Sequence, residues 1–151
     1  MRCLFALLVA LGVPALVSAS PAPSVSATEQ GIAIGGYDPV AYFTAGRPVA
    51  GSASFELRWN GATWRFASAE SRARFEANPA AYAPAFGGYC AWAISQNYIV
   101  PGDPLVWRIV DGRLYLNFNQ RAKVLWEADL AGAIVRGNRN WPAVLETAEN
   151  R

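Results

Sequence analysis

The chain has 151 residues, the size of one domain, with 13 basic and 11 acidic side chains and a net charge of +2. This near-neutral balance, with scattered arginines and a single lysine, excludes the clustered basic surface that nucleic-acid binding rewards. There is no histidine, which excludes Ser-His-Asp and Cys-His catalysis and every imidazole metal site.

Residues 1–19 have the pattern of a signal peptide. Arg2 supplies the positive end, residues 3–17 form an uncharged, almost wholly apolar run, and Ala19 offers a small residue for cleavage. The run is shorter than the roughly 20 residues that a membrane-spanning helix needs. We therefore expect a periplasmic or secreted protein with no membrane span after cleavage, and a flexible tether over residues 20–30.

A single α+β domain is expected over residues 31–145, followed by a frayed polar tail at 146–151. The domain opens with a turn at Tyr37-Asp38-Pro39. The Asp38 carboxylate can accept local backbone N–H groups there, while Pro39 fixes the next φ. The alternative for Asp38 is a role as an acid or a ligand.

Two β-hairpins are the clearest local structures. Residues 55–66 turn at Asn60-Gly61 and residues 105–118 turn at Asp111-Gly112, and both pairs suit a two-residue type I′ turn. The expected apolar partners are Trp59 with Ala62, Leu57 with Trp64, Phe55 with Phe66, Ile109 with Leu114, and Trp107 with Leu116, with Leu105 and Phe118 extending the second face. We expect the two hairpins to join in one small antiparallel sheet.

Short helices are expected to pack on this sheet, over residues 68–77, 120–128 and 130–136. Ser68 and Asn119 can cap the first two. In the second helix the inward stripe is predicted at Val124, Leu125 and Ala128, with Trp126 near its edge.

The two hairpins and the helices that follow them show the same order of signals. Placing Gly61 on Gly112 also brings Phe75 onto Trp126 and Asn78 onto Asp129. We interpret this agreement as an internal pseudo-repeat of two ββα units.

The stretch around Cys90 is the candidate functional site. Cys90 is the thiol that remains after removal of the leader, since Cys3 lies within it. Two glycines before it allow close approach of backbone, and large aromatic residues flank it. The residues expected to line a site are Tyr37, Asp38, Gly87, Gly88, Tyr89, Cys90 and Trp92. The aromatics without an assigned place in the core, and so further candidates for a pocket wall, are Trp92, Tyr98 and Trp141.

Three roles are open for Cys90. It can be a buried small hydrophobe, since free cysteine is among the most buried residue types. It can be a ligand for a metal ion or contact a small molecule, and a lone thiolate suits copper(I) better than zinc, which takes four N or S ligands. It can also be the reactive group of a thiol enzyme or redox protein, which requires a neighbour that lowers its pKa.

A further series of motifs runs through the chain. In a short frame it comprises Asp38-Pro39-Val40, Trp64-Arg65-Phe66 after an Asn-Gly turn, Phe75, Asn78-Pro79 and Tyr82. In a longer frame it comprises residues 36–43, Gly87-Gly88-Tyr89-Cys90-Ala91 and Asn140-Trp141-Pro142. The short frame resembles the YHS domain, and the longer one resembles the exported YHS domain-containing protein family over nearly all of the mature chain.

The resemblance implies a small α+β module with a hairpin packed on helices. Short YHS domains resemble heavy-metal-binding modules, whose cysteines correspond here to Ala41 and Ala67 and whose Tyr-His-Ser falls near Phe55-Glu56-Leu57. The metal site of the short domains is therefore absent as ordinarily built, and Cys90 is the soft ligand left. We expect an exported, non-catalytic binding or accessory module for a metal ion, copper favoured, or a small ligand near Cys90. The alternative is a thiol-dependent redox protein or enzyme that uses Cys90.

Overall fold

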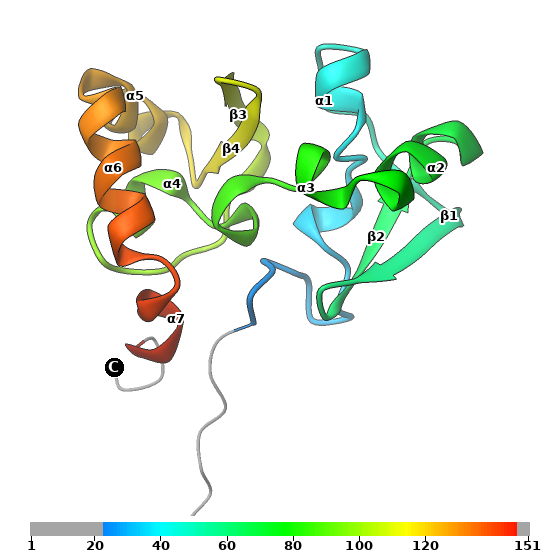
Figure 1. Cartoon of the computed structure of the whole chain (residues 1–151), viewed down its shortest axis with the longest axis horizontal. Helices are drawn as coiled ribbons and strands as arrows, with labels where there is room; N and C mark the ends of the chain where they lie inside the picture. Colours follow the sequence, from blue (N-terminus) through cyan, green and yellow to red (C-terminus); the bar gives the residue numbers. More distant parts are fainter. Residues whose placement is uncertain (1–22, 148–151) are drawn as a thin grey trace, which may run out of the picture.

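The computed structural model describes residues 23–147, so the predicted signal peptide lies outside the described residues. The fold is α+β, as predicted (Figure 1). The strands are β1 (Ser52–Trp59), β2 (Ala62–Phe66), β3 (Asp103–Val110) and β4 (Arg113–Asn117). The α-helices are α1 (Ala41–Thr44), α2 (Ala69–Ala77), α3 (Pro79–Tyr82), α4 (Ala91–Ser95), α5 (Gln120–Ala128), α6 (Leu130–Asn140) and α7 (Ala143–Thr147), and the 3-10 helices are η1 (Ile34–Gly36) and η2 (Ala85–Gly88). Within residues 23–147 no helix combines the length and apolarity needed to cross a membrane.

The two hairpins form two separate two-stranded sheets, so the prediction of one joined sheet is wrong. The reason lies at the strand edges. The outer edge of β2 is taken by Ile32, which bridges to Thr63 in parallel, and β4 has a parallel bridge between Leu116 and Cys90. Because a strand edge that is already hydrogen-bonded offers fewer groups to a further strand, β2 and β4 each close a sheet of their own.

The register next to each turn is as predicted, and it changes farther away. Trp59 lies opposite Ala62 and Leu57 opposite Trp64, while Ile109 faces Leu114 and Trp107 faces Leu116. A register shift in β1 then places Ser52, and not Phe55, opposite Phe66. The matching shift in β3 places Asp103 opposite Asn117, and Leu105 and Phe118 are 57% and 54% exposed, so they do not extend the apolar face.

The pseudo-repeat is supported by a constant spacing of elements. The offset that places Gly61 on Gly112 also places the first residue of β1 on that of β3, the first residue of β2 on that of β4, and the first residue of α2 on that of α5. The register shifts occur at equivalent places. Ser68 and Asn119 cap the two helices in the same way, each accepting a hydrogen bond from the backbone N–H three residues on, at 3.1 and 2.8 Å.

Two large apolar clusters and a small one of Cys90, Ala93 and Ala122 form the core of the described residues. The first surrounds Trp64 and Phe75, and the second surrounds Trp126. Strand β4 joins the clusters, because Leu116 belongs to the first and its neighbour Tyr115 to the second. Residues of β4 thus face apolar neighbours on both sides of the hairpin.

The predicted inward face of α5 is wrong. Trp126 is fully buried, with its ring centroid 5.1 Å from that of Tyr115, whereas Val124 and Leu125 are 64% and 43% exposed and Ala128 is exposed as well. Apolar side chains lie around most of this helix, so periodicity could not select the buried face. Tertiary packing buried the largest aromatic side chain.

Residues 23–26, within the described part of the predicted tether, pack against the domain. Val25 is 2% exposed, Ser26 N–H donates to the Gly87 carbonyl at 2.9 Å, and the Tyr89 hydroxyl donates to the Pro23 carbonyl at 2.8 Å. A Cβ on Gly87 would overlap the Ser24 carbonyl oxygen. The composition of this segment did not reveal the surface that it packs against.

Two boundaries near the C-terminus also differ from the prediction. Helix α6 continues to Asn140 instead of ending at 136, because Gly137 serves close packing and not helix termination: a Cβ there would lie 2.6 Å from Phe86 Cζ. Helix α7 includes Glu146 and Thr147, so the described start of the predicted frayed tail is helical.

Candidate functional site

An open cavity of about 390 Å³ lies beside Cys90. Its lining residues come from α4 and its N-cap, from the loop after α4, from the link between β4 and α5, and from α5: Cys90, Trp92, Tyr98, Val100, Phe118, Asn119, Arg121, Ala122 and Leu125. Three of these are large apolar side chains left in water, Tyr98, Phe118 and Leu125, at 39%, 54% and 43% exposure. A gathering of exposed apolar side chains around a hollow is typical of a binding site.

The Cys90 thiol is held in place by hydrogen bonds and is nearly sealed from water. It is 1% exposed, its S–H donates to Asn117 Oδ1 at 3.7 Å, and its sulfur accepts from Ala93 N–H at 3.5 Å. Burial raises the pKa of this thiol, and the nearby backbone N–H groups lower it by less. Near neutral pH Cys90 is therefore a protonated thiol, which is a poor nucleophile.

Asn117 is a site residue that the sequence did not reveal. It is fully buried, and its Oδ1 accepts from Trp92 N–H at 3.0 Å as well as from the Cys90 thiol. The Trp92 N–H can only donate, so it fixes which end of the amide points toward α4. An asparagine in a strand carries no local signal of burial.

Cys90 and Trp92 are the predicted site residues that line the cavity, and Tyr98 joins them as the sequence suggested for a pocket wall. Trp141, the third unplaced aromatic, instead packs with Phe86 and Tyr89 at ring distances of 6.0 and 6.2 Å. The aromatic side chains of the cavity wall are thus Trp92, Tyr98 and Phe118.

The other five predicted residues do not line the cavity. Tyr37 packs on the first core cluster, and Gly87 and Tyr89 contact residues 23–26. Gly88 accepts a backbone hydrogen bond from Gly102 N–H at 3.1 Å. Asp38 is fully buried, with Oδ1 accepting from Val40 N–H at 2.8 Å and Oδ2 from Ala67 N–H at 3.0 Å. The bond to Val40 matches the turn interpretation of Asp38, and the bond to Ala67 ties the turn to the end of the first hairpin.

Asp38 and Cys90 occupy similar positions in the two halves, with a spacing one residue longer than the offset that places Gly61 on Gly112. Each follows a Gly-Gly-Tyr sequence. The backbone N–H of Asp38 donates to Val49 and that of Cys90 donates to Val100, both at 2.9 Å. The pseudo-repeat therefore extends back to the glycine turns and includes the candidate site.

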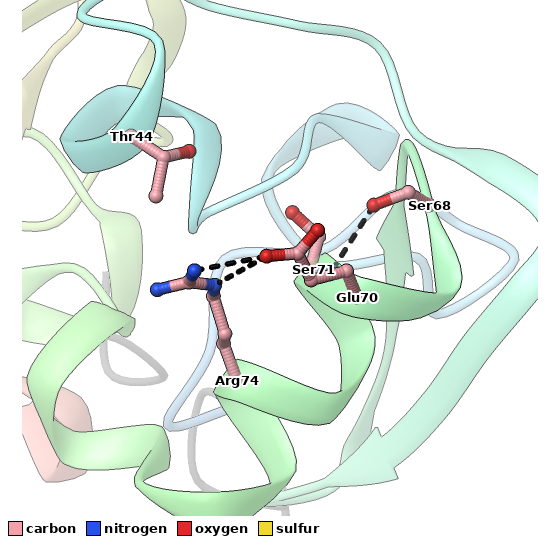
Figure 2. Close-up of a pocket in the computed structure, with 5 residues that line it drawn as sticks. All are labelled: Thr44, Ser68, Glu70, Ser71 and Arg74. Carbon is pink, nitrogen blue, oxygen red and sulfur yellow. Dashed lines mark hydrogen bonds and ion pairs between the residues drawn. The ribbon is translucent and has the colours of Figure 1, made fainter.

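The first half has a cleft at the equivalent place, shown in Figure 2. It has a volume of about 170 Å³ and is lined by Thr44, Ser68, Glu70, Ser71 and Arg74. By the offset of the pseudo-repeat, the last four correspond in order to four residues of the Cys90 cavity: Asn119, Arg121, Ala122 and Leu125. The same position in the two halves is thus a polar cleft in one and a mostly apolar cavity in the other.

The copper ion favoured by the sequence stays a prediction, because the structure places no cluster of metal-ligating side chains around Cys90 within residues 23–147. Within residues 23–147 no group of three or more cysteine, aspartate, glutamate or histidine side chains comes together to hold a metal. The remaining soft ligands of the sequence, Cys3 and Met1, lie outside the described residues. A structural zinc ion takes four N or S ligands, so Cys90 alone does not form a zinc site.

Fold and site together define a small α+β protein with an open, largely apolar cavity over a buried thiol. Comparisons with family models, with curated proteins and with solved structures find no match for this chain. The resemblance to YHS proteins therefore stays a prediction.

Proposed function

We propose that this protein is a non-catalytic binding module that takes a small, largely apolar molecule into the cavity beside Cys90. The observation that supports it is the grouping of exposed Tyr98, Phe118 and Leu125 around a hollow of about 390 Å³. Small-molecule sites typically measure about 300–1,000 Å³ and have mostly apolar walls. A ligand that covers these side chains gains roughly 25 cal/mol for each Å² of apolar surface removed from water.

In this proposal Cys90 contributes packing and not chemistry. Its burial and raised pKa disfavour the thiolate that a redox protein or thiol enzyme requires. A polarisable sulfur next to Trp92 suits contact with an aromatic or aliphatic ligand. With the predicted leader and the YHS resemblance, the proposal assigns this binding to the periplasm or the exterior of the cell.

The test is a fluorescence titration with N-phenyl-1-naphthylamine, a neutral apolar probe. We expect saturable binding to the wild-type protein and at least about tenfold weaker binding to Leu125→Glu, because a charge in the wall loses apolar contact worth roughly 1.4 kcal/mol or more. Val124→Glu is the matched control, since Val124 is the adjacent residue of α5, is 64% exposed and does not line the cavity. Absence of saturable binding, or equal loss in both variants, would overturn the proposal.

A further inference from the structure

The two equivalent clefts differ in how their charges are paired. In the first half Glu70 Oε1 accepts from Arg74 Nη2 at 2.9 Å and from Arg74 Nε at 3.3 Å (Figure 2). This i,i+4 ion pair neutralises the charge within the cleft. The first cleft therefore leaves no net charge from this pair for a ligand to meet.

In the second half the same two positions carry Arg121 and Leu125. The charge at the first position is thus reversed, and its partner is replaced by an apolar side chain. Within residues 23–147 Arg121 forms no ion pair, and Glu127, the one acidic side chain of α5, pairs with Arg108 and Lys123. An uncompensated guanidinium consequently stands in the wall of a cavity that is otherwise uncharged.

Arg121 and the apolar wall would recognise different parts of one molecule. A planar guanidinium pairs with carboxylate or sulfonate oxygens through two parallel N–H donors. Trp92, Tyr98 and Phe118 offer ring surfaces that an aromatic or aliphatic body can cover. The arrangement matches an amphiphilic anion in charge as well as in polarity.

Building on the proposed function, we propose that the ligand is an amphiphilic acid whose apolar body fills the cavity and whose acidic group pairs with Arg121. The first half does not share this preference, because its equivalent cleft is polar and carries Glu70 where Arg121 stands. The specificity of the chain thus comes from divergence between its two halves.

Two probes with the same body separate this inference from the proposed function. N-phenyl-1-naphthylamine is neutral, and 8-anilinonaphthalene-1-sulfonate adds one acidic group to the same ring system. Titrations compare the wild-type protein, Arg121→Gln, and Arg139→Gln as the control. Arg139 is also an exposed arginine without an ion pair in residues 23–147, but it lies on α6 and does not line the cavity.

We expect Arg121→Gln to weaken binding of the sulfonate probe about fivefold, the effect of a partly exposed ion pair, and to leave the neutral probe unchanged. Arg139→Gln should change neither, and added salt should reduce the wild-type preference for the sulfonate. If the neutral probe binds normally and Arg121→Gln affects both probes equally or neither, the preference for an acid is overturned and the proposed function stands. If the neutral probe fails to bind the wild-type protein, the proposed function itself falls.

Discussion

Asp38 and Cys90 hold similar stretches of backbone with different chemistry. A carboxylate accepts strong hydrogen bonds, and Asp38 takes the N–H groups of both Val40 and Ala67. A thiol accepts weakly, so Cys90 receives Ala93 N–H at 3.5 Å while Asn117 receives Trp92 N–H. The change from aspartate to cysteine is therefore accompanied by a buried amide that replaces the missing acceptor.

The raised pKa of Cys90 predicts a loss of stability in alkaline solution. The unfolded chain releases the thiol proton near the ordinary value of 9.0, and the folded chain releases it at a higher pH. The contribution of Cys90 to the free energy of unfolding is therefore fully present below pH 9.0 and falls as pH rises, by at most about 1.4 kcal/mol per pH unit.

Chemical denaturation of the wild type and of Cys90→Ser between about pH 8 and about pH 10 measures this effect, because serine does not titrate in that range. The wild type should lose more stability over the interval than the variant does. Tyr42, Tyr89 and Tyr115, whose pKa values are also raised by burial, are present in both proteins and cancel in the comparison. Parallel pH profiles would contradict the prediction.

At the scale of the elements, Gly87 positions the first described residues of the chain, 23–26. Residues 23–26 lie directly on Gly87, whose φ is +61° and whose position leaves no space for a Cβ beneath Ser24. The same segment contacts Tyr89, the residue that ends η2, because the Pro23 carbonyl accepts a hydrogen bond from the Tyr89 hydroxyl. Gly87 thus connects the start of the described chain to the stretch that carries Cys90.

Gly87→Ala should destabilise the protein and release this segment. A left-handed φ costs alanine about 1–2 kcal/mol, and displacement of Ser24 adds to that cost. Gly46→Ala is the matched control, since Gly46 has a similar φ of +65° and a Cβ added there would meet nothing within 4 Å. Hydrogen exchange of the Ser26 amide, which donates to Gly87, should accelerate in Gly87→Ala and not in Gly46→Ala. Equal effects of the two variants would contradict this role.

On the scale of the whole molecule, β4 unites the two halves of the pseudo-repeat. Leu114 and Leu116 belong to the first apolar cluster, and Tyr115 between them belongs to the second. In Figure 1 the β3–β4 hairpin lies between the helices α4 to α6 on one side and the β1–β2 hairpin with α2 on the other. A substitution in β4 should therefore destabilise both clusters, and we expect the two halves to unfold together in one transition.

Leu116→Ala tests this coupling, because Leu116 is fully buried and its loss leaves a cavity in the core. We expect the free energy of unfolding to fall by about 2–5 kcal/mol, with denaturation curves from tryptophan fluorescence and far-UV circular dichroism coinciding. Leu105→Ala, at a leucine that is 57% exposed, should change stability by about 0.5 kcal/mol or less. Two separate transitions in the wild type would contradict a single cooperative unit.

The sequence predicts the turns, the helix caps and the strand register beside each turn, because these depend on residues close together along the chain. Asn60-Gly61 and Asp111-Gly112 adopt the positive φ values of a type I′ turn, and the registers beside them follow. The helices capped by Ser68 and Asn119 begin where the caps predict. The predicted grouping of Cys90, Trp92 and Tyr98 at one site likewise involves residues close together along the chain.

The remaining walls of the cavity could not be predicted, because contacts distant in sequence decide them. The sequence pattern predicts Phe118 and Leu125 on inward faces, but both are exposed. The register shift in β3 removes Phe118 from the apolar face, and the burial of Trp126 leaves Leu125 on the outer side of α5. The burial of Asn117 depends on α4, some 25 residues earlier. Turns, caps and adjacent register are set by the sequence itself, since the groups involved lie within a few residues of one another. Sheet edges, buried helix faces and the cavity were decided by the tertiary structure, since packing selects among local alternatives of nearly equal energy.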